Sequence, residues 1–240
     1  MVTIDGKWRM EGLDREDPNR IKTSSELSEV IEELGFLPLF KNSISGFSVE
    51  EMTAADCWWS GTPEEDPWEW REVIANEGRI AYGKFFCNRA GFISREWFPY
   101  FAVYRRDGYD FDSRYEDGLA SRKHKKLMDL LELSTSMPSY ELKKYAGFCK
   151  AGETGFEGAV TALQMQTYII VNGFHRRRNR RNEEYGWSVA DYALSERLFG
   201  EEHVRSAYGM GTDEAKCRMI ARLQKNFPKA SELEAEKLIR

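Results

Sequence analysis

Five arginines in six consecutive positions are the residues with the clearest chemical potential in this sequence. They lie in the stretch "NGFHRRRNRRNEEYGWS" and are Arg176, Arg177, Arg178, Arg180 and Arg181. A guanidinium group stays protonated and binds phosphate oxygens through two parallel hydrogen bonds. Several such groups together would neutralise several phosphates. The pattern therefore favours nucleic-acid binding over a solvated loop whose charge Glu183 and Glu184 partly offset.

Charge is distributed unevenly along the chain. The formal net charge is −5, yet residues 119–181 carry 12 lysines and arginines against 5 acidic residues. Residues 1–118 carry 14 basic against 24 acidic residues, and residues 182–240 carry 9 against 11. The basic middle segment therefore predicts an anion-binding face that the whole-chain charge conceals.

Length and composition indicate a globular protein. The 240 residues are 41% hydrophobic and 31% charged, which suits one large domain or two small ones. We find no apolar run long enough for a membrane span and no signal-peptide pattern, so we expect a cytoplasmic protein that does not bind membranes. The cysteines and histidines are scattered without a CxxC pair. We therefore expect no disulfide framework, no metal and no other cofactor.

Other catalytic patterns are absent or incomplete. The sequence contains no glycine-rich phosphate loop, no G-x-S-x-G and no HExxH. The acidic stretch at 107–118 approaches an EF-hand loop, but Arg114 stands where the fifth position requires an oxygen ligand. We interpret this stretch as a turn-rich connector. The tryptophans at 58, 59, 68 and 70 are interpreted as core residues in preference to a platform for stacked bases.

Residues 23–106 predict a first unit of three helices and a β-hairpin, which follows a flexible arm at 1–22. Thr23 with Glu26 forms a capping-box pattern before an apolar helical periodicity. Asp66–Pro67 suits the start of a later helix, since proline fits the first helical turn. The expected helices cover residues 23–34, 48–55 and 67–77, and the expected hairpin covers 79–94.

Residues 119–199 repeat the same order in a second unit, after the connector at 107–118. The expected helices cover residues 120–133, 138–146 and 155–167, and the expected strands cover "YIIVNGF" and "GWSVADYAL" on either side of the arginine cluster. Residues 200–240 predict a C-terminal helical segment that ends in a polar tail.

Three helices followed by a strand, a loop and a strand are typical of a winged helix. We therefore predict an α+β, mainly helical fold of tandem winged helix-turn-helix units with short β-hairpin wings. In that fold the third helix faces the major groove of DNA and the wing follows the backbone. The arginine cluster then lies at a wing tip. Lys143 and Lys144 add backbone contacts, and Thr161 and Met165 approach base edges. His175 fits a phosphate contact or an ordinary hairpin residue, and we favour the latter.

The same segments resemble a known family. "FEGAVTALQMQTYIIVNGFHRRRNRRNEEYGWSVADYALSERLFG" resembles the middle winged helix of the AlkZ/YcaQ DNA glycosylases, which unhook crosslinks and remove alkylated bases. "GRIAYGKFFCNRAGFISREWFPYF" is similar to the segment after that family's first winged-helix unit. "PWEWR" and "YRRDGYDFDSRYEDGLAS" resemble the shorter AlkZ-related proteins more closely. The resemblance, over about residues 45–200, implies a duplex-DNA partner and a role in DNA repair.

The resemblance also implies a catalytic signature that this sequence lacks at the family position. The signature is Gln-x-Gln or Gln-x-Asp in the first winged-helix unit, but no glutamine precedes Gln164. Gln164 and Gln166 would point roughly 160° apart on a helix. They would face one way only if the helix ended early and both lay on a strand. We therefore assign no catalytic residue.

Three functions remain open at this point. The first is a duplex-DNA-binding winged-helix protein that is related to the glycosylases but lacks their motif. The second is an active glycosylase for alkylated or crosslinked bases that uses other residues, since carboxylates and aromatic residues are plentiful. The third is a protein-interaction module, including a homodimer, because winged helices also pair with proteins and the acidic flanks would repel DNA.

Overall fold

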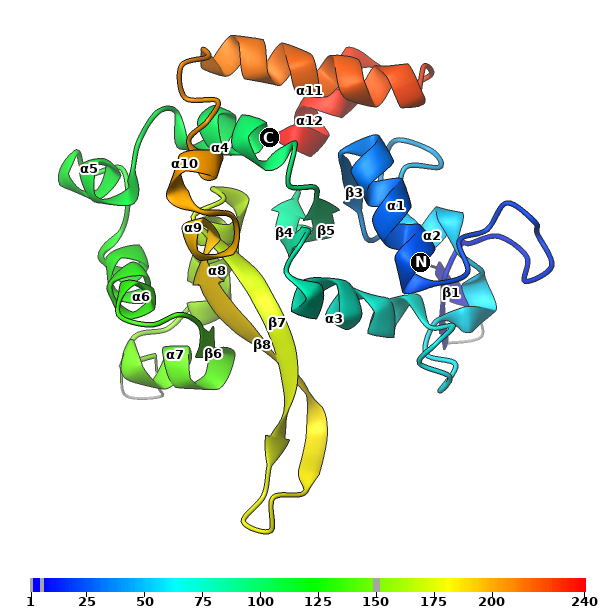
Figure 1. Cartoon of the computed structure of the whole chain (residues 1–240), viewed down its shortest axis with the longest axis horizontal. Coiled ribbons are helices and arrows are strands. Elements are labelled where there is room, and N and C mark those ends of the chain that lie inside the picture. Colours follow the sequence, from blue (N-terminus) through cyan, green and yellow to red (C-terminus); the bar gives the residue numbers. More distant parts are fainter. Residues whose placement is uncertain (1, 5–6, 149–151) are drawn as a thin grey trace.

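The computed structural model describes residues 2–4, 7–148 and 152–240, and its central feature is an antiparallel sheet of six strands surrounded by helices (Figure 1). The strands follow the order β3 (Phe36–Pro38), β5 (Arg89–Ile93), β4 (Ala81–Phe86), β7 (Ile169–Arg178), β8 (Glu184–Leu194) and β6 (Met137–Pro138). A separate pair, β1 (Val2–Ile4) and β2 (Lys7–Arg9), lies at the N-terminal end. The α+β class predicted from the sequence is confirmed.

The helices of the first unit begin where their capping residues predict. The elements are α1 (Ser24–Leu34), α2 (Val49–Met52), the 3-10 turn η1 (Ala55–Cys57), α3 (Pro67–Glu77) and α4 (Phe98–Arg106). The Thr23 hydroxyl accepts from the amide of Glu26, and the Asp66 carboxylate accepts from the amide of Trp68. These bonds satisfy backbone donors that a helix start leaves open. The aromatic stretch that forms α4 was not predicted as a helix.

The second unit has its expected helices as well. These are α6 (Arg122–Glu132), α7 (Ser139–Tyr145) and α8 (Phe156–Met165), after a short α5 (Phe111–Glu116) inside the expected connector. The C-terminal segment forms α9 (Ser195–Phe199), α10 (Glu201–Val204), α11 (Thr212–Asn226) and α12 (Glu232–Ile239). The expected polar tail is wrong, because α12 buries Leu238 and Ile239.

Both predicted hairpins form, and they join in the sheet. β4 and β5 pair across Cys87 and Asn88, which both have positive φ, as a tight two-residue turn requires. β4 also pairs with β7 at Tyr82 and Val171, so the two units share the sheet. Each unit has its expected three helices followed by a hairpin, with an additional short strand, β3 or β6, after the first of these helices. The tandem winged-helix arrangement itself stays a prediction.

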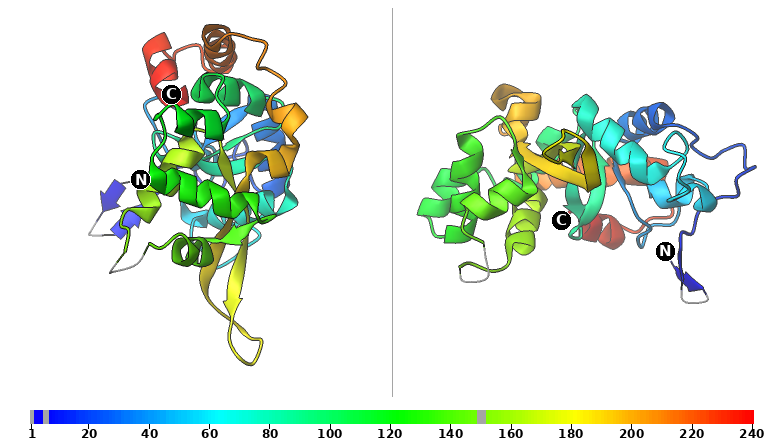
Figure 2. Two further views of the ribbon diagram at one scale, coloured as in Figure 1. Left: turned by 90° about the vertical axis from the view of Figure 1, so that its left-hand side faces the viewer. Right: turned by 90° about the horizontal axis from the view of Figure 1, so that it is seen from below.

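The β7–β8 hairpin is the most prominent projection of the molecule. Its root is packed in the sheet, and its far end extends well beyond the body in Figure 1 and in the first view of Figure 2. Asn76 of α3 fixes the root, since its side-chain oxygen accepts from the amide of Phe174 at 2.7 Å. A Cβ at Gly173 would lie 2.5 Å from that oxygen, so this close approach requires glycine.

The segment before α1 is less free than predicted. Met10 and Ile21 are buried, and Leu13 and Ile21 form bridges with Ala54 and Thr53. Residues 10–22 are therefore attached to the first unit, in contrast to the flexible arm expected over 1–22. The cause is long-range packing that a local charge pattern does not reveal. Among the helices that the structure describes, none has the length and apolarity to cross a bilayer.

Candidate nucleic-acid interface

The arginine cluster lies on the projecting part of the β7–β8 hairpin, partly in a strand and partly in a turn. Arg176, Arg177 and Arg178 are the last residues of β7, whereas Arg180 and Arg181 lie in the turn, and all five are exposed. The expectation that all five occupy a loop is thus wrong for the first three. The hairpin ladder continues to Arg178 and Glu184, because the backbone groups of both strands still pair there.

The tip of the hairpin is organised by its own side chains. The Asn179 side-chain oxygen accepts from the amides of Arg181 and Glu183, at 2.8 and 3.1 Å. Arg178 forms an ion pair with Glu184 at 3.1 Å. For Arg180 and Arg181, no carboxylate partner is found among the described residues. The two outermost guanidinium groups are therefore directed to solvent by a structured turn.

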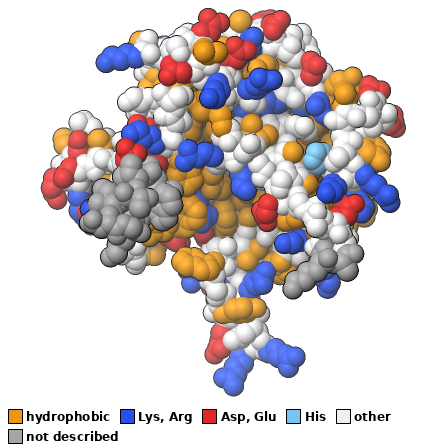
Figure 3. All heavy atoms as spheres, turned by 180° about the vertical axis from the view of Figure 1, so that it is seen from behind, with side chains coloured by type: hydrophobic (Ala, Val, Ile, Leu, Met, Phe, Trp, Pro, Cys, Tyr) orange, Lys and Arg blue, Asp and Glu red, His pale blue; other side chains and the backbone are white. Residues whose placement is uncertain are grey.

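A groove opens at the root of the hairpin. Its volume is about 480 Å³, and its lining comes from the β4–β5 hairpin, the start of α3, α8 and the roots of β7 and β8. We call it the aromatic groove, after five of its lining residues, which are Phe40, Trp68, Tyr82, Phe174 and Tyr192. From behind, Figure 3 shows hydrophobic side chains in a hollow above the hairpin, with lysine and arginine side chains around it.

Arg71 is the buried cation of the aromatic groove. Its guanidinium lies 3.9 Å from the ring centre of Trp68 and 4.6 Å from that of Phe174. Its Nη2 donates to Glu72 at 3.0 Å, whereas its Nε is buried and has no hydrogen-bond partner among the described residues. The residue is only 6% exposed. Burial raises the pKa of the neighbouring Tyr82 to about 12, so that hydroxyl stays neutral.

Two further cations lie at the edge of the groove on the β4–β5 hairpin. Lys84 Nζ donates to the Thr161 hydroxyl at 3.3 Å, and Arg89 lies 5.2 Å from the ring centre of Phe40. Within the described ranges, neither Lys84 nor Arg89 has an ion pair with a carboxylate. Both therefore keep positive charge that the surrounding protein does not neutralise.

The predicted contacts of α8 and α7 differ from those of an open recognition surface. Thr161 holds Lys84, and the Met165 sulfur accepts from the amide of Asn88 at 3.4 Å. Both side chains therefore face the β4–β5 hairpin. Lys143 and Lys144 are exposed, and each lies against an aromatic ring within about 6 Å. Contact of these four residues with DNA stays a prediction.

The two glutamines have separate environments. Gln164 is 1% exposed, and its side-chain oxygen accepts from the amide of Lys84 at 2.8 Å. A Cβ at Gly83 would lie 2.9 Å from that oxygen, so this contact also depends on glycine. Gln166 caps the C-terminus of α8, and its buried side-chain oxygen has no partner among the described residues. The alternative in which both lie on a strand does not occur.

A histidine and several carboxylates border the hairpin root. His175 Nδ1 lies 2.9 Å from a carboxylate oxygen of Asp191 on β8, which supports the interpretation of His175 as a hairpin residue. Burial raises the pKa of Asp191, although the bond to His175 acts in the opposite direction. Burial also raises the pKa of Glu69, with Glu72 adding to the shift.

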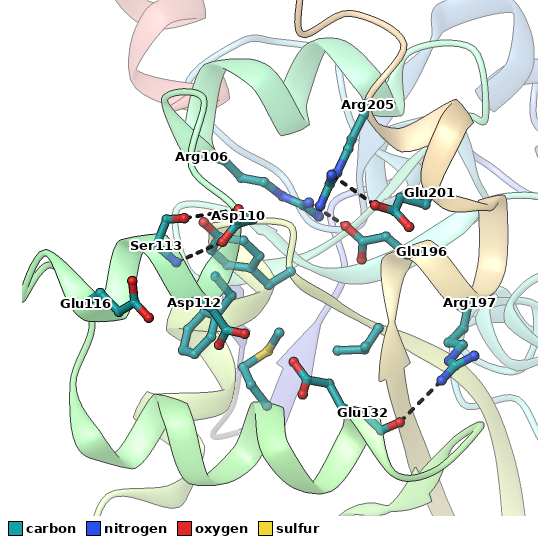
Figure 4. Close-up of a pocket in the computed structure, with 14 residues that line it drawn as sticks. Arg106, Asp110, Asp112, Ser113, Glu116, Glu132, Glu196, Arg197, Glu201 and Arg205 are labelled. Atoms are coloured by element: carbon teal, nitrogen blue, oxygen red, sulfur yellow. Dashed lines mark hydrogen bonds and ion pairs between the residues drawn. The ribbon is translucent and has the colours of Figure 1, made fainter.

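A second cavity, of about 640 Å³, has the opposite character (Figure 4). Six carboxylates line it together with three arginines, and many of these charges are already paired. Arg106 bonds Glu196 at 2.5 Å, and Arg205 bonds Glu201 at 2.9 Å. Asp110 caps α5 through Ser113. We call this cavity the acidic pocket and interpret it as a structural junction of α5, α6, α9 and α10.

Sequence reasoning missed the residues that make the aromatic groove. Trp68 was interpreted as a core residue, and Arg71, Lys84 and Arg89 were not singled out. The one local signal is "PWEWR", because Trp68 and Arg71 are three residues apart and neighbours on a helix surface. Among the described residues, no group of three or more potential metal ligands is found.

Comparison with known proteins identifies the family of this α+β protein. The model of the AlkZ-related family matches residues 21–240, nearly the whole chain. The chain therefore belongs to the AlkZ-related family, which confirms the resemblance seen in its sequence. No curated protein and no solved structure matches the chain.

Proposed function

We propose that this protein binds duplex DNA in DNA repair, as a relative of the AlkZ glycosylases that lacks their catalytic glutamine motif. The observation that carries the proposal is the projecting β7–β8 hairpin, which exposes five arginines, although Arg177 also lies 4.2 Å from the ring centre of Tyr140 on α7. Family membership supports a glycosylase-like role in DNA repair. In this proposal the hairpin acts as the wing of the second of two winged-helix units.

Two features of the hairpin support a polyanionic partner. Glu183 and Glu184 are the acidic residues near the tip, so the five arginines keep a clear excess of positive charge. Tyr185 and Trp187 on β8 are also exposed, Trp187 by 86%. Proteins that bend or open DNA combine basic side chains with exposed apolar ones that enter between base steps. The hairpin offers both.

The test is fluorescence anisotropy with a labelled duplex at low salt. Replacing all five arginines by alanine should weaken binding at least about tenfold, which corresponds to about 1.4 kcal/mol. A control variant removes five exposed cations elsewhere, which are Arg79, Arg205, Arg218, Lys225 and Lys229. It changes the net charge equally and should retain most of the affinity. Equal affinities for both variants would refute the hairpin as the DNA surface.

An active glycosylase is the second candidate, and the aromatic groove beside the hairpin favours it for damaged bases that carry no positive charge. Enzymes that act on a base in DNA need a stacking pocket for that base. Incubation with alkylated or crosslinked DNA, followed by detection of released base and abasic sites, decides between the two. Release by the wild-type protein establishes the activity. Intact DNA with binding retained leaves the non-catalytic proposal. Failure to bind duplex together with a stable dimer would favour the protein-interaction alternative.

A further inference from the structure

The aromatic groove has the size and position to receive one nucleotide. Its volume of about 480 Å³ falls within the range of small-ligand sites, about 300–1,000 Å³. Phe174, Ser188, Ala190 and Tyr192 of its lining belong to β7 and β8, the strands that carry the arginine cluster further out. The groove therefore lies on the same hairpin as the arginine cluster, next to a pocket that Arg176 and Arg178 line and that shares Phe174 and Ser188 with it.

The lining suits both parts of a nucleotide. Aromatic side chains stack on any base, because every base has a π face. Trp68, Phe174 and Phe40 are only partly buried, which leaves parts of their surfaces open to the groove. Lys84 and Arg89 at the edge have no carboxylate partner within the described ranges and can bind phosphate oxygens. The groove thus combines a stacking surface with free positive charge.

The same lining disfavours a positively charged base. No carboxylate lines the groove among the described residues. Aromatic cages bind cations through the faces of their rings. Here the guanidinium of Arg71 already occupies the space between Trp68 and Phe174, at 3.9 and 4.6 Å from the ring centres. Glu72 balances the charge of Arg71 at 3.0 Å, but Arg71 covers the ring faces that a second cation would need, and Lys84 and Arg89 would repel that cation.

We propose that the aromatic groove binds a single unpaired nucleotide with a neutral base, extruded from duplex DNA, and rejects bases that carry the positive charge of ring alkylation. The inference rests on the proposed duplex binding and adds a ligand class to it. Lys84 and Arg89 hold the phosphate, the ring surfaces that the arginines leave open stack on the base, and Arg71 occupies the ring faces that a cationic base would need.

The first test compares a duplex containing one unpaired adenine with the fully paired duplex of the same sequence. Wild-type protein should bind the former about tenfold more tightly in fluorescence anisotropy. Ser188→Trp fills the groove from β8 and should abolish this preference while leaving the affinity for paired duplex within about twofold. Val189→Trp is the matched control, because the neighbouring strand residue points to the opposite face of the sheet and does not line the groove. It should keep the preference.

Ala90→Trp is a second blocking variant from the opposite wall, for use if Ser188→Trp does not fold. The inference is wrong if a folded blocking variant keeps the preference, or if wild-type protein binds paired duplex without any preference. Failure of wild-type protein to bind either duplex overturns the proposed function, and the inference with it. These outcomes are therefore distinguishable.

The second test compares a neutral base with a positively charged one. Duplexes with an unpaired guanine or an unpaired N7-methylated guanine, each with a 2′-fluoro sugar that protects the glycosidic bond, differ by one positive charge. The neutral base should be bound at least about fivefold more tightly. Equal or tighter binding of the cationic base would show that the groove does not exclude it.

Discussion

Two buried arginines define two regions of this molecule with different roles. In the acidic pocket, Arg106 is 1% exposed and its guanidinium bonds Glu196, Ser195 and both the hydroxyl and the carbonyl oxygen of Thr167. In the aromatic groove, Arg71 is 6% exposed and bonds Glu72, and its other close neighbours include the rings of Trp68 and Phe174.

The two buried arginines differ in how their surroundings satisfy them. Thr167 connects α8 to β7 with a φ of 64°, which is a costly conformation for a β-branched residue. Arg106 holds this junction, and although burial lowers its pKa, Glu196 together with Tyr208 and Tyr168 raises the pKa overall. Arg71 has few polar partners and lies beside open space. The first arginine is therefore structural, and in our proposal the second determines which base the groove admits.

The largest effect is expected from Arg106→Met. The change removes the bonds to Thr167 and Ser195 and leaves Glu196 without its buried partner. Breaking a buried ion pair in this way costs about 3–5 kcal/mol. Urea denaturation should show this loss in the free energy of unfolding.

Arg197→Met provides the control for the same pocket. Arg197 is exposed, and among the described residues it donates only to the carbonyl oxygen of Glu132, at 3.3 Å. Its replacement should change the free energy of unfolding by no more than about 0.5 kcal/mol. If the two variants lost similar amounts of free energy of unfolding, Arg106 would be no more important for stability than the exposed Arg197.

A smaller loss is expected from Arg71→Met. Methionine retains apolar contact with Trp68 and Phe174, so the main losses are the two cation–π contacts and the bond to Glu72. We expect about 1–2 kcal/mol in the same urea experiment. The variant should also bind a cationic base better than wild-type protein does. A loss as large as that of Arg106→Met would make Arg71 structural as well.

The smallest effect is expected from Glu69→Gln at the hairpin root. Burial raises the pKa of Glu69, so its charged form is less favourable in the folded protein than in the unfolded chain. The resulting cost is present above the raised pKa and vanishes as pH falls below the ordinary carboxyl range. Glutamine should therefore raise the melting temperature at pH 7 by no more than about 2 °C.

The pH dependence is the check on this last prediction. The difference between Glu69→Gln and wild-type protein should shrink as the pH is lowered from about 7 to about 4. A difference that is constant over this range, or a variant that is less stable at pH 7, would contradict it.

Local features of the structure could be predicted from the sequence, and long-range ones could not. The starts of α1 and α3 depend on Thr23 and Asp66, and the β4–β5 turn depends on Cys87 and Asn88, which are neighbours of the elements they shape. The pairing of Tyr82 with Val171 has no local signal. For the same reason the sequence did not reveal the shared sheet, the role of Arg106 or the aromatic groove.

The candidate site also has one part that the sequence predicts and one part that it does not. The basic hairpin was predictable, because its strands and its arginines are contiguous in the sequence. The groove was not, because Trp68, Lys84, Gln164 and Tyr192 come from four separate elements. Gln164 illustrates this limit of sequence reasoning. Its spacing to Gln166 resembles a catalytic Gln-x-Gln signature, but in the structure its buried side chain accepts a hydrogen bond from the amide of Lys84.

The salt dependence of duplex binding tests the central claim most directly. The logarithm of the association constant should fall with the logarithm of salt concentration by a slope of about −0.9 for each phosphate contact. Alanine at all five hairpin arginines should make that slope less steep by about 3–5, whereas the five-cation control should leave it nearly unchanged. An unchanged slope for the hairpin variant would contradict the account.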